Sequence, residues 1–191
     1  MDVPGAVVIG GSAGALDVLR AIVRALPPVI PCPVVVVIHL PSHSSGLAEL
    51  LGAETSLKVK QAEDKEPLVA GVIYIAPPSY HLLIESSGTF ALSVDPPVHY
   101  SRPAIDVLFE TARDVYGRNL IGVLLSGASE DGAAGLQEIH AAGGTTIVQT
   151  PLSAEVAIMP AAALALFQPT YLWSPNELAS SLSQLLSGSA I

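Results

Sequence analysis

Three polar residues of the sequence carry the side chains that acyl-transfer chemistry needs. Ser12 lies in the segment Gly10-Gly11-Ser12-Ala13-Gly14, and His39 and Asp131 each follow an apolar run further along the chain. A serine hydroxyl can attack a carbonyl carbon, an imidazole can take up the hydroxyl proton, and a carboxylate can hold the imidazole in the required tautomer. Together the three residue types favour a serine hydrolase.

The segment around Ser12 has the G-x-S-x-G pattern of a serine displayed on a tight strand-to-helix turn. Glycines allow the sharp turn, and N–H groups at the start of the following helix can stabilise an oxyanion. Glycine and serine turns also bind phosphates and cofactors, so the pattern alone leaves both interpretations open. It does not match G-x-G-x-x-G, and no acidic residue follows the next strand to bind a ribose, which disfavours a dinucleotide site.

His39 and Asp131 each have a second interpretation. A histidine at the end of a strand is often a hydrogen-bonded turn residue, and an aspartate before a helix is often its N-cap. Asp131 can instead orient the His39 imidazole, and its two carboxylate oxygens allow one to cap a helix while the other binds the ring.

Apolar, β-branched runs alternate with stretches of helical periodicity, which predicts a mostly parallel sheet. The continuous apolar run 34–38 is typical of a strand covered on both faces. The predicted fold class is α/β: a doubly wound, mostly parallel sheet with helices on both faces and a short antiparallel hairpin. The predicted strands are 6–9, 34–38, 72–75, 120–125, 145–149 and 171–173, the hairpin strands are 81–85 and 89–94, and the predicted helices are 16–26, 47–51, 103–116, 131–142, 159–167 and 176–186.

This arrangement brings the three polar residues to one edge of the sheet. Ligands of open parallel sheets bind beyond the carboxyl ends of the strands, and Ser12, His39 and Asp131 all follow predicted strands. A right-handed crossover between the first two strands places Ser12 beside His39. The chain order Ser, His, Asp differs from the Ser, Asp, His order of α/β-hydrolases, so that fold is excluded.

Composition excludes several other classes of protein. Half of the residues are hydrophobic, which disfavours disorder, and 17 acidic against 8 basic residues give a net charge of −9 that disfavours nucleic acid as a partner. Mean hydropathy is +0.55, but the longest strongly apolar runs, 34–38 and 161–167, are far shorter than the roughly 20 residues of a membrane span. The single Cys32 cannot close an intrachain disulfide. We expect one cytoplasmic domain, 1–191, without membrane insertion.

The sequence resembles the catalytic domain of chemotaxis protein-glutamate methylesterases, which also deamidate receptor glutamines. The resemblance extends, in the order of the family, from residue 6 to about residue 165. The segments that carry it are Val8 to Gly14, Ile38 to Pro41, Gly71 to Pro78 with His81-Leu82, Ser101 to Phe109, Leu125 to Gly135, Gly143-Gly144 and Met159-Pro160.

The resemblance implies a role for each of the three residues. Ser12 is the implied nucleophile, His39 the general base and then acid, and Asp131 the group that orients His39. Backbone N–H groups near Ala13 and in the loop that contains Ala128 are implied to bind the oxyanion. The implied substrate is a γ-glutamyl methyl ester on methyl-accepting chemotaxis receptors, and neither a metal nor an organic cofactor is implied.

Some features depart from the family pattern. Ala13 and Ala15 replace a hydroxyl residue and a second glycine, and Ala128 replaces a methionine, so we expect a pocket of altered shape. Members typically carry an N-terminal receiver domain, whereas the first strand here begins close to Met1. We therefore expect no receiver domain within 1–191: the chain is either an excised catalytic domain or a stand-alone form without that control, and a separate regulatory protein is a candidate partner. An esterase or amidase with another substrate and a non-catalytic scaffold in two-component signalling therefore remain alternatives.

The remaining polar residues receive weaker predictions. Arg102 is a candidate for binding a substrate carboxylate, with a structural salt bridge as its alternative. Glu130 and Asp131 adjoin each other but lack a third metal ligand nearby. We expect His43 to be a solvated loop residue, with a place at the rim of the site as the alternative. We expect His81 in a structural role, His99 and His140 on the surface, and Met159 in the core.

Overall fold

The computed structural model describes residues 4–39 and 46–187, and its centre is a seven-stranded parallel sheet. The strand order is β3-β4-β2-β1-β7-β8-β9, and a separate antiparallel pair, β5-β6, forms a second sheet. The strands are β1 (Ala6–Gly11), β2 (Val34–Ile38), β3 (Lys58–Gln61), β4 (Val72–Ile75), β5 (His81–Ile84), β6 (Phe90–Ser93), β7 (Leu120–Leu124), β8 (Thr145–Gln149) and β9 (Tyr171–Trp173).

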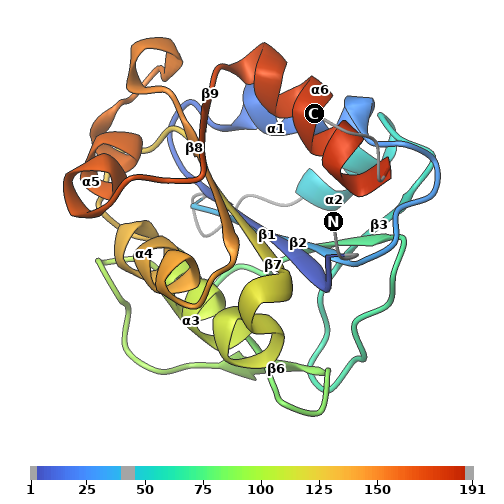
Figure 1. Ribbon diagram of the computed structural model, residues 1–191. Coiled ribbons are helices and arrows are strands. Elements are labelled where there is room, and N and C mark those ends of the chain that lie inside the picture. The colour runs from blue at the N-terminus through green and yellow to red at the C-terminus, as the bar shows by residue number, and fades with distance from the viewer. Residues whose placement is uncertain (1–3, 40–45, 188–191) are drawn as a thin grey trace.

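Helices cover both faces of the large sheet (Figure 1). Val7 and Ile9 of β1 pack on one face, and Ala6 and Val8 pack on the other, because side chains alternate along a strand. One face is covered by α1 (Leu16–Ala25), α2 (Leu47–Gly52) and α6 (Pro175–Ser187). The other is covered by α3 (Ile105–Tyr116), α4 (Ala133–Ala141) and α5 (Ile158–Leu166). The described residues also include the short 3-10 turns η1 (Gly117–Asn119) and η2 (Pro151–Ser153).

The connections after β1 and β7 leave the sheet in opposite directions. The chain passes from β1 into α1 on one face, and from neighbouring β7 into α4 on the other face. Such a switch point opens a crevice at the carboxyl ends of the two strands, where α/β proteins bind their ligands. Ser12 follows β1 and Asp131 follows β7, so both residues lie at this crevice.

The predicted fold class is confirmed: a parallel sheet covered on both faces, with an antiparallel pair. The strand β3 was not predicted, because its sequence Lys-Val-Lys-Gln is polar and lies at the exposed edge of the sheet. No helix within residues 4–39 and 46–187 is both long and apolar enough to cross a membrane.

Two predicted helix starts are wrong. The third helix begins at Ile105 rather than Pro103, and the fourth begins at Ala133 rather than Asp131. Gly132, with φ of 87°, precedes the fourth helix, which has no side-chain cap. The expectation that Asp131 caps its own helix is therefore wrong, and its carboxylate binds the first turn of α3 instead.

Candidate active site

Ser12 and His39 directly follow two paired strands, β1 and β2. Gly11 pairs with Ile38, and the His39 N–H donates to the Gly11 carbonyl at 3.0 Å. On the other side of β1, the Ser12 N–H donates to the Ser126 carbonyl at 2.9 Å. The expected proximity of Ser12 and His39 is thus confirmed, and hydrogen bonds to both neighbouring strands fix the backbone at the serine turn.

Neighbouring side chains pack closely around the turn that carries Ser12 and around the loop after β7. Gly14 has φ of +76°, and a Cβ there would lie 2.5 Å from Cβ of Glu155. At Gly127, a Cβ would lie 2.5 Å from Cε of Met159 and 3.0 Å from Cβ of Ser12. Glycine is needed at position 14 because of its positive φ and because Cβ of Glu155 occupies the space that a Cβ would take, whereas a Cβ at position 127 would require the Met159 side chain to move. The loop after β7 therefore packs directly against the serine.

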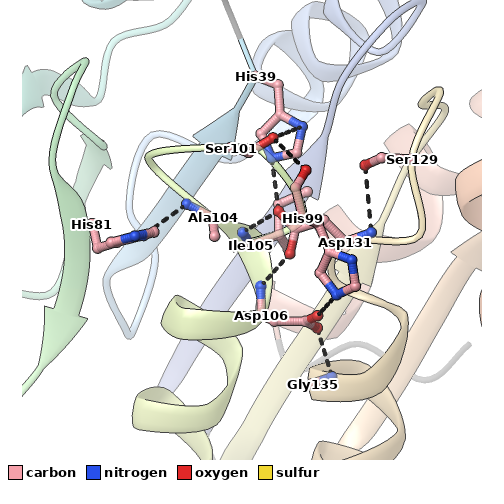
Figure 2. A network of polar contacts seen from close by, with 10 residues as sticks. All are labelled: His39, His81, His99, Ser101, Ala104, Ile105, Asp106, Ser129, Asp131 and Gly135. Atoms are coloured by element: carbon pink, nitrogen blue, oxygen red, sulfur yellow. Dashed lines mark hydrogen bonds and ion pairs between the residues drawn. The ribbon is translucent and has the colours of Figure 1, made fainter. Parts of the chain in front are cut away.

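His39 is hydrogen-bonded to Asp131, as Figure 2 shows. Nε2 of the ring lies 2.8 Å from Oδ2 of Asp131, whose side chain is fully buried, whereas 13% of the His39 side chain is exposed. Because an ionised carboxylate only accepts hydrogen bonds, Nε2 carries the proton and Nδ1 keeps a free lone pair. His39 is thus oriented with Nδ1 as its basic atom.

Asp131 has a second set of partners in the first turn of α3. Its Oδ2 accepts from the Ile105 N–H at 2.7 Å, and its Oδ1 accepts from the Asp106 N–H at 2.9 Å. These two N–H groups have no carbonyl partner inside the helix, and the carboxylate also interacts favourably with the positive end of the helix dipole. One aspartate therefore both starts α3 and orients His39.

The basic atom of His39 faces a serine that was not predicted. Oγ of Ser101 lies 3.4 Å from Nδ1 of His39 (Figure 2), and Oγ of Ser12 makes no hydrogen bond within residues 4–39 and 46–187. Ser101 precedes Arg102 in a loop instead of following a strand, so its sequence position gave no reason to single it out. Ser12 and Ser101 are both candidates for hydrogen bonding to Nδ1.

A second carboxylate lies beside Asp131. Asp106 is buried, its Oδ1 accepts from the Gly135 N–H at 2.7 Å, and its Oδ2 lies 3.4 Å from Nε2 of His99 (Figure 2). Burial, with a smaller contribution from the charge of Asp131, raises the pKa of Asp106 to about 6. His99 is half-exposed, as expected of a surface residue, but its contact with Asp106 was not predicted.

Several backbone N–H groups near Ser12 are available for a ligand, among them those of Ala13 and Ala128. Those of Ser12 and Gly127 donate to the carbonyls of Ser126 and Val156, whereas those of Ala13 and Ala128 have no acceptor in the described part of the chain. Ala13 and Ala128 are both exposed. These groups can therefore donate to an oxyanion formed next to Ser12.

Arg102 is held by the backbone of its own loop. Its Nη1 donates to the carbonyls of Val94 at 2.7 Å and Asp95 at 3.0 Å. Arg102 forms no salt bridge among the described residues, so the alternative prediction, a structural salt bridge, does not hold there. Its prediction as a carboxylate-binding residue stays a prediction.

The other weighed residues lie as follows. His81 is buried and structural, as predicted: its Nδ1 accepts from the Ala104 N–H, and its Nε2 lies 3.1 Å from the Pro96 carbonyl oxygen. Met159 is buried in the core, and His140 is exposed and lies against Phe167, which confirms both predictions. His43 lies outside the described residues.

The fold and the site define an α/β protein with the side-chain set of a serine esterase. A family model described as CheB methylesterase matches residues 7–182. The chain therefore belongs to the CheB methylesterase family, and the family and the class of enzyme predicted from its segments are confirmed. The fold agrees as well: the CheB methylesterase catalytic domain of Thermotoga maritima has a TM-score of 0.91 and 32% identity, covering 95% of this chain and 98% of that one.

Relatives of two different lengths are similar to the chain. A protein of Leptospira interrogans is 45% identical over 175 residues, which is 91% of this chain and 91% of the relative. A protein-glutamate methylesterase/protein-glutamine glutaminase of Methanosarcina mazei is 39% identical over 165 residues, covering 84% of this chain but 46% of the relative. The family segment thus occurs both nearly alone and as part of a longer protein.

Proposed function

We propose that this protein hydrolyses γ-glutamyl methyl esters on chemotaxis receptors through Ser12, His39 and Asp131. The observation that carries the proposal is the 2.8 Å hydrogen bond between His39 and Asp131, formed at the strand end next to Ser12. The names of the family and of its relatives supply the substrate class.

In the proposed reaction, Ser12 Oγ attacks the ester carbonyl carbon and its proton passes to Nδ1 of His39. The imidazolium that forms is stabilised by Asp131, which holds the opposite ring nitrogen. His39 then gives the proton to the departing methoxide, so methanol leaves and an acyl-enzyme remains. A water molecule, deprotonated by His39, cleaves the acyl-enzyme and returns the glutamate carboxylate and the Ser12 hydroxyl.

The oxyanion of each tetrahedral intermediate would be bound by the N–H groups of Ala13 and Ala128. Both belong to the backbone, so alanine supplies them as well as any other residue would. The small side chains affect only the shape of the pocket. A glutamine amide would form the same acyl-enzyme with release of ammonia, and we propose deamidation as a second reaction of the site, in line with the name of the M. mazei relative.

The test is release of methanol from methyl-esterified receptors by wild type and Ser12→Ala. We expect release by the wild type and none above background by Ser12→Ala, because no other group replaces the covalent nucleophile. Ser180→Ala, an exposed serine on α6, is the matched control and should retain wild-type activity. Near-normal release by Ser12→Ala would overturn the assignment of the nucleophile.

A serine-reactive fluorophosphonate separates the alternatives. Labelling of Ser12 without methanol release would indicate an esterase or amidase with a different substrate. Absence of both signals in the folded wild type would favour a non-catalytic scaffold, which is the outcome that the His39–Asp131 pair argues against.

A further inference from the structure

Residues 98–101 form a tight turn with an unusual sequence. Val98 and Ser101 exchange two backbone hydrogen bonds, of 3.1 Å and 2.8 Å, and the two residues between them, His99 and Tyr100, have φ of 46° and 60°. A two-residue turn with positive φ at both positions favours Asn-Gly, because a Cβ is disfavoured in the left-handed region. Histidine and tyrosine therefore occupy positions that their side chains make unfavourable.

The turn is kept in this conformation by contacts with the active site. On one side, His99 Nε2 lies 3.4 Å from Oδ2 of Asp106, and on the other side Ser101 Oγ lies 3.4 Å from Nδ1 of His39 (Figure 2). Asp106 is itself attached to Asp131 through its N–H group. Both flanks of the turn are thus connected to the His39–Asp131 pair.

Tyr100 has no packing partner within residues 4–39 and 46–187. Its side chain is completely exposed, and its hydroxyl makes no hydrogen bond within the described part of the chain. Local strain that is maintained by surrounding contacts is concentrated at functional sites, and a large exposed aromatic ring is a frequent anchor in protein interfaces. No packing contact of Tyr100 within the described residues therefore offsets its unfavourable backbone conformation.

We propose that Tyr100 is a specificity-determining residue, whose ring packs on the polypeptide that carries the ester while that ester is bound at Ser12. The partner chemistry is a folded protein segment with apolar side chains next to the reacting glutamyl group, because an aromatic ring gains most from apolar burial. The residue that follows Tyr100 contacts the general base, so a segment bound at Ser12 passes close to the ring. This inference rests on the proposed esterase function.

The experiment compares two substrates: methyl-esterified receptor and a single glutamic acid γ-methyl ester with both ends blocked. Glycine is tolerated at positive φ, so Tyr100→Gly removes the ring and keeps the turn. In Tyr100→Gly, the ratio of kcat/KM for the receptor to kcat/KM for the small ester should fall by about tenfold, because KM for the receptor rises. Tyr100→Phe should restore the ratio, and Val29→Gly, which removes an exposed apolar side chain before β2, should leave it at the wild-type value.

An unchanged ratio for Tyr100→Gly would overturn the inference. Equal losses on both substrates would also overturn it, because they would mean that the substitution only disturbs Ser101 and His39. Failure of the proposed function gives a different result, since the wild type would then not hydrolyse the receptor ester, whether or not it hydrolyses the small one.

Discussion

Two histidines of this protein, His39 and His81, have both ring nitrogens occupied but differ in the chemistry of their partners. His81 is 2% exposed, and within the described residues its ring hydrogen-bonds only to backbone groups, the Ala104 N–H and the Pro96 carbonyl. His39 lies at the crevice and contacts a carboxylate and a hydroxyl. Backbone partners make His81 a connector between loops, whereas a carboxylate on one nitrogen and a replaceable hydroxyl on the other are the partners that the proposed role of His39 as general base requires.

The same contrast applies to the surroundings of the two rings. His81 joins the start of β5 to the segment before α3, and its bonds hold the small sheet against the main body of the protein. His39 depends on Asp131, which reaches it from the far side of β1. Substitutions near His81 should therefore affect mainly stability, and substitutions near His39 mainly the rate.

Among substitutions of the partners of the two histidines, the largest effect is expected for Asp131→Asn. An amide keeps the shape of the side chain but has an NH2 group where the carboxylate accepts from both His39 and Ile105. We expect kcat for methanol release to fall by about 10⁴-fold, as loss of the orienting carboxylate does in other triads. A loss of less than tenfold, measured by methanol release from methylated receptor, would mean that Asp131 mainly caps α3.

His81→Leu should instead act on stability. It leaves the buried Ala104 N–H without its partner, which costs about 2 kcal/mol, whereas the carbonyl of the exposed Pro96 can bind water instead. Urea unfolding measures this free energy, and kcat of the folded variant should change far less than in Asp131→Asn. A 10⁴-fold loss of kcat in folded His81→Leu would remove the distinction between the two histidines.

Asp106 should make stability depend on pH. Its pKa is raised from 3.8 to about 6 in the folded protein, so the folded state binds more protons than the unfolded state between these values. Its contribution is complete below about pH 4 and is lost as pH rises through 6, which amounts to about 3 kcal/mol for a shift of about two units.

The test of this dependence is unfolding of wild type and Asp106→Asn in urea at pH 4, 5, 6 and 7. An asparagine can still accept from the Gly135 N–H but does not titrate, so the difference in stability between the two proteins should change across this range. The groups that face Asp106 are Asp131, His99 and Glu110, and they are the same in both proteins. Parallel curves would contradict the assignment.

The smallest effect is expected for Ser101→Ala. The contact of Ser101 with His39 is 3.4 Å long and therefore weak, and Ser12 must replace it at Nδ1 before reacting. We expect kcat to change by at most about fivefold. Fluorophosphonate labelling should persist in Ser101→Ala and disappear in Ser12→Ala, and the reverse pattern would make Ser101 the nucleophile.

The sequence was sufficient for the parts of the fold that local pattern determines. Apolar runs such as 34–38 predicted buried strands, and the position of Ser12 and His39 after two such runs predicted that they lie side by side. The edge strand β3 was missed because only one residue in Lys-Val-Lys-Gln is apolar.

Contacts between distant segments could not be predicted in the same way. Asp131 caps α3, which begins 26 residues earlier, and Ser101 meets His39 across 62 residues of sequence. Neither contact leaves a periodic signal, because each depends on how loops from separate strands meet in the crevice. The contact between His99 and Asp106 was missed for the same reason.

The double attachment of Asp131 has a practical consequence for trapping complexes. Any substitution that removes its negative charge also removes at least one of the two oxygens that accept from the first turn of α3, so an inactive variant made at this position is also a weakened one. The Ser12 side chain has no comparable structural role, because its hydroxyl makes no hydrogen bond among the described residues. A stable inactive variant for capturing substrates from cells is therefore better made by substituting Ser12 than by substituting Asp131.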